Sequence, residues 1–348
     1  MAKEKTAKER TPLDYVFFAR DEMERRRKAP VQTKAEDVAS RFKTERKPAL
    51  IVDPKLGFNN RIIRTWINKL LPGSEEGVGG WKVLGHRHSV EAVIYIKQGR
   101  GYSVVDGKRY DWEAGDFICV PYFAWHRHVN EGDGEMHYMA CTTQHLSRAL
   151  GVAVYEDERY PEYWVFAQKS EEALRSLVPG GAEVPPPTTP PPLVGGNGGL
   201  ASKLYEEQLY FSPEEEKRRR AGKVVVKAKD IKFDETRMGR LAYIVDPRIG
   251  FHVKQMSTLM AEIPAGGKSG AHRHLYEEIE YVLSGTGYSI IEDQRYDWKT
   301  GDAFSIPMFG WHQHFNAGKE PARFLVHTSR PAMENLGHVL TQQGETAS

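Results

Sequence analysis

Short runs of apolar residues alternate with glycine and proline turns along this chain. Residues 93–96, 102–105 and 117–120 are such runs. Asp106-Gly107 directly follows the second run, and that dipeptide is typical of a tight β-hairpin. Strands of this length and spacing predict an antiparallel sandwich or barrel.

The whole pattern occurs twice. Residues 15–27 are similar to 208–220 at an offset of 193, and both stretches predict a charged helix. Residues 86–130 match 272–316 at an offset of 186, with 21 identities in 45 positions. The first copy has seven more residues around 71–77, which predicts a longer loop there. A duplicated chain of 348 residues therefore predicts two domains of one fold.

The predicted domain boundaries follow the composition. Residues 179–199 contain seven prolines and six glycines, which exclude a regular element and indicate a linker. We therefore expect an N-terminal domain with a helical arm over 1–178, a linker over 179–200 and a C-terminal domain over 201–348. A short helix beginning at Ser170 is predicted just before the linker.

Histidines form two clusters with metal-ligand spacing. His86 and His88 are two residues apart, and so are His272 and His274. Residues two apart on a strand face the same side, so each pair of imidazoles points together. A third histidine follows 38 residues after each pair, at His126 and at His312. The same spacing occurs in both copies, which indicates a metal site in each domain rather than packing.

The fourth ligand separates the two copies. Glu278 lies four residues after His274, which keeps it on the histidine face and completes a set of three His and one Glu. Glu280 shares that face. In the first copy the residue equivalent to Glu278 is Ala92, and Glu91 should face away. The first site is then three neutral imidazoles, with positions open for a substrate and dioxygen. Nitrogen and oxygen ligands suit iron, manganese, nickel, copper or zinc.

These motifs resemble the cupin family. The His-x-His pair is followed by Gly115-x5-Pro121 and by His126-x3-Asn130, and the second copy repeats that order. The resemblance implies an all-β protein of two jelly-roll barrels in tandem, with short flanking helices. Residues 86–130 are most similar to the gentisate, salicylate and 1-hydroxy-2-naphthoate ring-cleaving dioxygenases. That similarity implies Fe(II) bound by His86, His88 and His126, with His128 acting beside the substrate.

Two features depart from that group. The group often has an arginine six residues after the second ligand to hold the substrate carboxylate, and here that position is Ile94. Arg61 and Arg64 are candidates to replace it, with a role as surface charges as the alternative for both. Trp125 is a candidate for the pocket wall, with packing as its alternative. The second copy also keeps a complete ligand set, where the group's C-terminal domain is commonly degenerate.

The sequence therefore predicts a ring-cleaving dioxygenase acting on a small hydroxylated aromatic substrate with O2. One alternative is a manganese bicupin of the oxalate-decarboxylase type, which the second ligand set fits. Manganese or another divalent metal would then occupy the C-terminal barrel. The other alternative is a non-catalytic bicupin that binds a small ligand.

Composition excludes other classes of function. Lys and Arg total 49 against 47 Asp and Glu, so the net charge of +2 gives no basis for nucleic-acid binding. No apolar run is long enough for a membrane span, and the charged N-terminus predicts no secretory signal. Two cysteines cannot form a disulfide scaffold. We expect a cytoplasmic protein, and the family resemblance implies a homo-oligomer.

Overall fold

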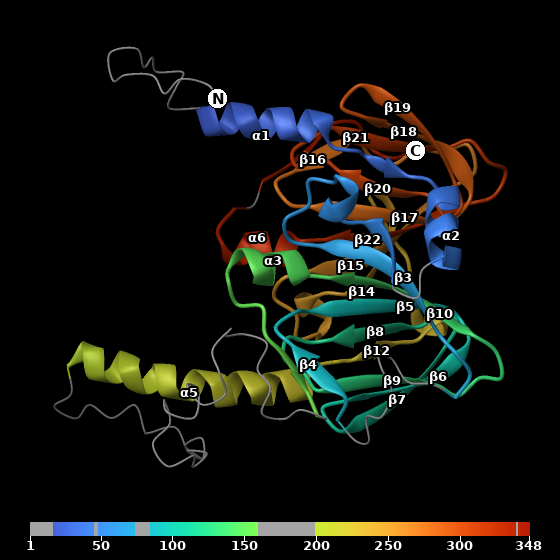
Figure 1. Ribbon diagram of the computed structural model, residues 1–348. Coiled ribbons are helices and arrows are strands. Elements are labelled where there is room, and N and C mark those ends of the chain that lie inside the picture. The colour runs from blue at the N-terminus through green and yellow to red at the C-terminus, as the bar shows by residue number, and fades with distance from the viewer. Residues whose placement is uncertain (1–16, 45–47, 74–83, 159–198, 339) are drawn as a thin grey trace, which may run out of the picture.

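The computed structural model describes residues 17–44, 48–73, 84–158, 199–338 and 340–348. The predicted helix at Ser170 and the linker up to residue 198 lie outside the described residues. Each copy of the repeat folds into two antiparallel sheets, and the two pairs of sheets lie in tandem (Figure 1). This arrangement confirms the predicted all-β fold. Within the described residues, no helix is both long enough and apolar enough to cross a membrane.

The first barrel consists of a six-stranded sheet in the order β12-β8-β5-β10-β3-β2 and a five-stranded sheet in the order β11-β4-β9-β6-β7. Its strands are β2 (Ala49–Val52), β3 (Arg64–Leu70), β4 (His86–His88), β5 (Ala92–Gln98), β6 (Arg100–Val105), β7 (Lys108–Glu113), β8 (Phe117–Val120), β9 (His126–Asn130), β10 (Met136–Thr142), β11 (Tyr155–Asp157) and β12 (Val225–Val226).

The second barrel consists of a seven-stranded sheet in the order β1-β20-β17-β22-β15-β14-β13 and a five-stranded sheet in the order β19-β18-β21-β16-β23. Its strands are β1 (Gln32–Thr33), β13 (Asp234–Thr236), β14 (Gly239–Val245), β15 (Ser257–Ile263), β16 (His272–His274), β17 (Glu278–Ser284), β18 (Thr286–Ile291), β19 (Gln294–Lys299), β20 (Ala303–Ile306), β21 (His312–Asn316), β22 (Ala322–Thr328) and β23 (Thr341–Gln343).

Helices flank the barrels. The α-helices are α1 (Phe17–Lys28), α2 (Ala35–Thr44), α3 (Gln144–Ala149), α5 (Leu200–Ala221) and α6 (Arg330–Asn335), and the short 3-10 turns are η3 (Pro54–Leu56), η5 (Ala228–Asp230) and η6 (Pro247–Ile249). With 22 residues, α5 is longer than the short flanking helices that the sequence predicts.

The predicted hairpin joins β6 to β7. Asp106 and Gly107 both have positive φ, 46° and 81°, as a two-residue turn between twisted strands requires. The turn sets the register in which Val105 pairs with Lys108.

The two barrels exchange their helical arms. β1, which follows α1, pairs with β20 of the second barrel, and β12, which follows α5, pairs with β8 of the first. In Figure 1, α1 accordingly lies over the second barrel and α5 beside the first. Arg219 of α5 contacts Asp106 at 2.9 Å, and Arg26 of α1 contacts Glu292 at 3.4 Å. The arm before the first barrel therefore completes the second barrel, and the arm before the second barrel completes the first.

Two buried glutamates hold the barrels together reciprocally. Glu91 of the first barrel accepts hydrogen bonds from the backbone N–H groups of Lys254 and Gln255, at 2.6 and 2.9 Å. Glu277 of the second barrel accepts them from the backbone of residues 61–63, at 2.5 to 3.0 Å. A shared apolar core, which includes Val93 and Ile279, surrounds these contacts. The glutamate that directly precedes β5 or β17 thus serves the interface between barrels.

Glu91 makes stability depend on pH. Burial, partly offset by the backbone hydrogen bonds, raises the pKa of Glu91 from 4.5 to about 7. The folded protein then binds this proton more tightly than the unfolded chain. The protonated Glu91 therefore stabilises the fold. This contribution to the free energy of unfolding is fully present below about pH 4.5. It is lost as the pH rises through about 7, and the loss is up to roughly 3 kcal/mol.

We expect Glu91→Gln, which cannot ionise, to reduce this fall in the free energy of unfolding. Urea denaturation at pH 5 and pH 8 measures it, with Glu113→Gln at an exposed position as the control. The same pH dependence in Glu91→Gln and in the wild type would contradict the assignment.

Candidate metal centres

The structure brings the three histidines of the first copy together. His86 and His88 extend from β4, and His126 extends from β9 opposite His86. One nitrogen from each ring lies within 4.8 Å of the others. His88 Nδ1 and His126 Nδ1 lie 2.9 and 2.8 Å from the carbonyl oxygens of Val90 and Ala124. A carbonyl only accepts, so both Nδ1 atoms carry the proton and both Nε2 lone pairs are available.

Burial keeps His126 neutral. Desolvation, reinforced by the neighbouring rings of His86 and His88, holds the pKa of His126 well below its usual range. Neutral imidazole is the form that binds a metal. His126 is therefore ready to ligate at neutral pH.

The second copy contains the corresponding cluster with a carboxylate added. His272, His274, Glu278 and His312 are all buried, and their ligand atoms lie within 4.8 Å of one another. Each imidazole again places Nδ1 on a backbone carbonyl, at 3.0 to 3.2 Å. Burial lowers the pKa of His272 to about 4. Glu278 lies 3.1 Å from His274 Nε2.

One distance in the second cluster fits a bound cation. The Nε2 atoms of His272 and His312 lie 3.0 Å apart, although the Nδ1 contacts leave no proton on either nitrogen. Two lone pairs facing each other at this distance repel unless a cation lies between them. Ligands at right angles with metal–nitrogen bonds of about 2.1 Å are about 3.0 Å apart. The donor set therefore fits a divalent metal.

The interiors of the two barrels differ in charge. In the second barrel, Glu280 Oε1 lies 3.1 Å from His314 Nε2, and both side chains are buried. His128 is the counterpart of His314 in the first barrel, but Glu280 is replaced there by Ile94 and Glu278 by Ala92. Glu91, as predicted, faces the interface instead. At the positions of Ala92 and Ile94 the first barrel therefore has no carboxylate, whereas the second barrel has Glu278 and Glu280 there.

Arg64 lies on the interior face of β3. Arg64 is opposite Thr142 on β10, and Thr142 is opposite Ala92 on β5. Because directly opposed residues share one face of a sheet, Arg64 lies on the same face as Ala92. Asp53, which is fully buried, accepts a hydrogen bond from Arg64 Nη1 at 3.0 Å. Within the part of the chain that the structure describes, the buried Arg64 Nε and Thr142 Oγ1 have no hydrogen-bond partner. Arg64 thus keeps donors for a ligand.

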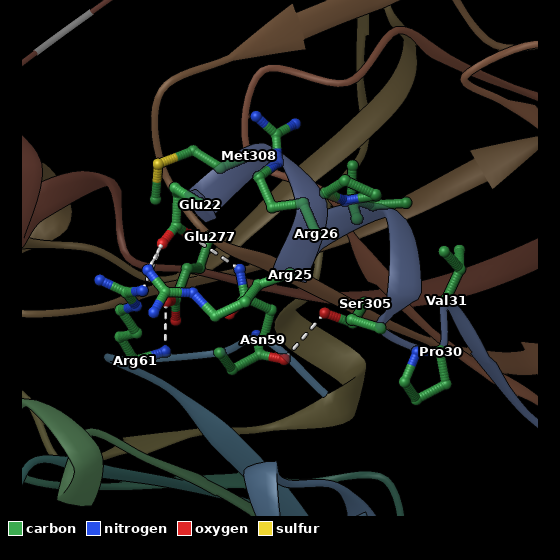
Figure 2. Close-up of a pocket in the computed structure, with 14 residues that line it drawn as sticks. Glu22, Arg25, Arg26, Pro30, Val31, Asn59, Arg61, Glu277, Ser305 and Met308 are labelled. Carbon is green, nitrogen blue, oxygen red and sulfur yellow. Dashed lines mark hydrogen bonds and ion pairs between the residues drawn. The ribbon is translucent and has the colours of Figure 1, made fainter. Parts of the chain in front are cut away.

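Two other predicted residues lie elsewhere. The Arg87 guanidinium, on the face of β4 opposite to the imidazoles, packs over the ring of Trp125 at 4.8 Å. Arg61 and Arg25 both contact Glu22, where α1 meets the second barrel, and the three side chains line a cavity of about 520 Å³ (Figure 2). The structure brings neither Trp125 nor Arg61 to the first histidine cluster.

The contacts of Glu22 have a copy at the other arm. Glu215 of α5 contacts Arg218 at 2.7 Å, and it also contacts Lys254, the counterpart of Arg61. The duplicated set of contacts indicates that these charges fasten each arm to the segment of its own repeat that meets the other barrel.

Sequence reasoning missed three residues that support the first site. Asp53 orients Arg64, while Ser103 and Trp112 connect by hydrogen bonds to His128. The signal was present, because Ser103 and Trp112 recur as Ser289 and Trp298 in the repeat.

Comparison with known proteins agrees with the fold. The model of the cupin domain matches residues 75–142 and 259–328. The chain is 25% identical to a 5-aminosalicylate 1,2-dioxygenase of a Comamonas species over 72% of this chain, and it spans 63% of that protein's length. It is 25% identical to gentisate 1,2-dioxygenase 1 of Aquipseudomonas alcaligenes over 84% of this chain and 78% of that one.

Among solved structures, the salicylate 1,2-dioxygenase of Pseudaminobacter salicylatoxidans is similar, with a TM-score of 0.61 and 18% identity. The alignment covers 90% of this chain and 88% of that one. The similarity confirms the tandem arrangement of two cupin barrels.

Both clusters should bind metal independently. We expect about two divalent ions per chain, about one after His126→Ala and about one after His312→Ala, because each substitution removes a ligand from one buried set. Elemental analysis of metal-loaded protein measures the ratio, with His137→Ala, which lies outside both clusters, as the control. A ratio that His312→Ala leaves unchanged would refute the second site.

Proposed function

We propose that the first of the two cupin domains cleaves the ring of a hydroxylated aromatic acid, with dioxygen as co-substrate. The observation that carries the proposal is the absence of a carboxylate from the Ala92 and Ile94 positions of the first barrel, beside three neutral imidazoles. That environment accepts an anionic substrate, whereas the interior of the second barrel repels one. The sequence relatives that act on aminosalicylate and gentisate support the reaction class.

His86, His88 and His126 would hold Fe(II) in the first barrel. The bound iron supplies a Lewis acid and a redox partner for dioxygen. We assign His272, His274, Glu278 and His312 to a second metal ion, which is Fe(II), Mn or another divalent metal. With its fourth ligand supplied by Glu278, the second site has fewer positions open than the first.

Arg64 is the residue we propose to bind the substrate carboxylate. Asp53 uses one of the five N–H donors of the guanidinium and fixes its orientation, which leaves donors such as Nε for a ligand. Although burial opposes ionisation, hydrogen bonds from His145, the Lys55 backbone and Arg64 hold the pKa of Asp53 well below its usual range. The pair is therefore ionised at all physiological pH values.

The remaining interior residues shape the site. Ala92 and Ile94 give an apolar surface for the aromatic ring, and the buried His128 is the catalytic residue we assign to the substrate oxygens. Trp125, which packs on Arg87, contributes to the outer wall rather than to the interior.

A manganese enzyme of the oxalate-decarboxylase type is the second candidate. The complete set of three His and one Glu in the second barrel favours it, and it would place the reaction there. A non-catalytic bicupin is less consistent with seven intact metal ligands.

We also propose that the protein is cytoplasmic and forms a homo-oligomer. Supporting the oligomer, Leu200, Leu204 and Phe211 lie within about 40° on one side of α5 and are exposed. Exposed apolar stripes of this kind mark contact surfaces, and a second copy of the chain is the partner we propose.

The location of the reaction is tested by oxygen uptake. Fe(II)-loaded protein, prepared anaerobically, is mixed with hydroxybenzoates, hydroxynaphthoates, catechols and hydroquinones. We expect uptake with at least one carboxylated substrate, its loss by at least 100-fold in His86→Ala, and its retention in His272→Ala. Loss in His272→Ala with retention in His86→Ala would transfer the reaction to the second barrel.

The role of Arg64 is tested by a neutral replacement of similar length. Arg64→Met should raise KM about 10- to 100-fold for a hydroxylated aromatic acid, because a charge-assisted hydrogen bond to the carboxylate is lost. The KM for the matching phenol without a carboxylate should be unchanged. Arg61→Met is the control, and an equal effect of both substitutions would contradict the assignment.

A further inference from the structure

Three buried side chains form a line of hydrogen bonds inside the first barrel. Trp112 Nε1 lies 2.9 Å from Ser103 Oγ, and Ser103 Oγ lies 2.7 Å from His128 Nδ1. All three residues are at most 2% exposed. The indole can lie this close because Gly101 is beneath it, where a Cβ would approach the ring to 2.7 Å.

The chemistry of the three groups fixes the direction of these bonds. An indole N–H only donates, so Ser103 Oγ accepts from Trp112. Among the described residues, the remaining hydrogen-bond partner of the Ser103 side chain is His128 Nδ1. The buried Ser103 hydroxyl proton therefore points to His128 Nδ1, because any other direction leaves it unsatisfied. It follows that Nδ1 of the neutral His128 ring is unprotonated and that Nε2 carries the proton.

The second barrel shows where that Nε2 proton points. Its counterparts Ser289 and His314 keep the contact, with Ser289 Oγ 2.7 Å from His314 Nδ1, and His314 Nε2 faces Glu280 at 3.1 Å. In the first barrel Ile94 stands in place of Glu280, and an alkyl side chain accepts no proton. The Nε2–H group of His128 is thus aimed at the side of the interior where Glu280 lies in the second barrel.

We propose that Trp112 and Ser103 are positioning residues that hold His128 as a hydrogen-bond donor to an anionic oxygen of the substrate. A neutral ring with its proton on Nε2 offers no lone pair there, so His128 does not act as a base toward the substrate. The nature of the acceptor, a carboxylate or phenolate oxygen, rests on the proposed function, whereas the proton position on His128 does not.

The position of the proton is measured without turnover. Zinc-loaded protein labelled with ¹⁵N in its histidine rings gives NMR signals that distinguish protonated from unprotonated ring nitrogens. His128 is assigned by the signals that disappear in His128→Gln. We expect the proton on Nε2 in the wild type and a shift toward Nδ1 in Ser103→Ala and in Trp112→Phe.

Trp298→Phe is the matched control, because it removes the same indole N–H from the second barrel, where Nε1 has no hydrogen-bond partner among the described residues. It should leave the His128 signals unchanged. A proton on Nδ1 in the wild type, or an Nε2 proton that persists fully in both Ser103→Ala and Trp112→Phe, would overturn the proposal. If Trp112→Phe fails to fold, Ser103→Ala alone decides.

Turnover gives an independent readout. Ser103→Ala should lower kcat about tenfold while metal content and KM change less than twofold, because a transition-state hydrogen bond is weakened. An unchanged kcat would overturn the positioning role. If no hydroxylated aromatic acid is turned over by the wild type, the proposed function fails, and the NMR signals still decide the position of the proton.

Discussion

The alternation of side chains along a β-strand is the constraint on which both sites and their interface depend. Adjacent residues on a strand must face opposite sides. Where β17 begins, this separates two neighbouring carboxylates, since Glu277, directly before the strand, binds the backbone of the first barrel and Glu278 joins the histidines of the second. In the first copy Glu91 keeps the interface role while Ala92 leaves the metal cluster without a carboxylate. The same strand pattern therefore holds the barrels together and makes their chemistry different.

The difference in interior charge determines which ligand each barrel favours. Both imidazole clusters place Nδ1 atoms on backbone carbonyl oxygens, so the ligating histidines alone do not distinguish the barrels. What distinguishes them is the loss of Glu278 and Glu280 in the first copy and the presence there of Arg64, whose counterpart is Ser257. A site with no carboxylate at these positions and a half-buried guanidinium favours an aromatic acid. A site with two carboxylates favours a metal ion.

Much of this arrangement was predictable from sequence, because it depends on local spacing. The period of two placed His86 and His88 on one face, the repeat identified Glu278 and Ala92 as counterparts, and Asp106-Gly107 predicted the hairpin. The exchange of arms was not predictable, since β1 pairs with β20 across some 270 residues and the two repeats offer equivalent partners. For the same reason the ion pair of Arg64 with Asp53 and the packing of Trp125 on Arg87 required tertiary structure.

The central claim is that an aromatic acid binds in the first barrel and is excluded from the second. A crystal structure of the anaerobic Fe(II)-loaded protein with a hydroxylated aromatic acid tests it most directly. The account predicts density for the acid beside His86, His88 and His126, with its carboxylate on Arg64 and an oxygen within hydrogen-bond distance of His128 Nε2. Density beside His272 and His312 instead, or a carboxylate bound away from Arg64, would contradict it.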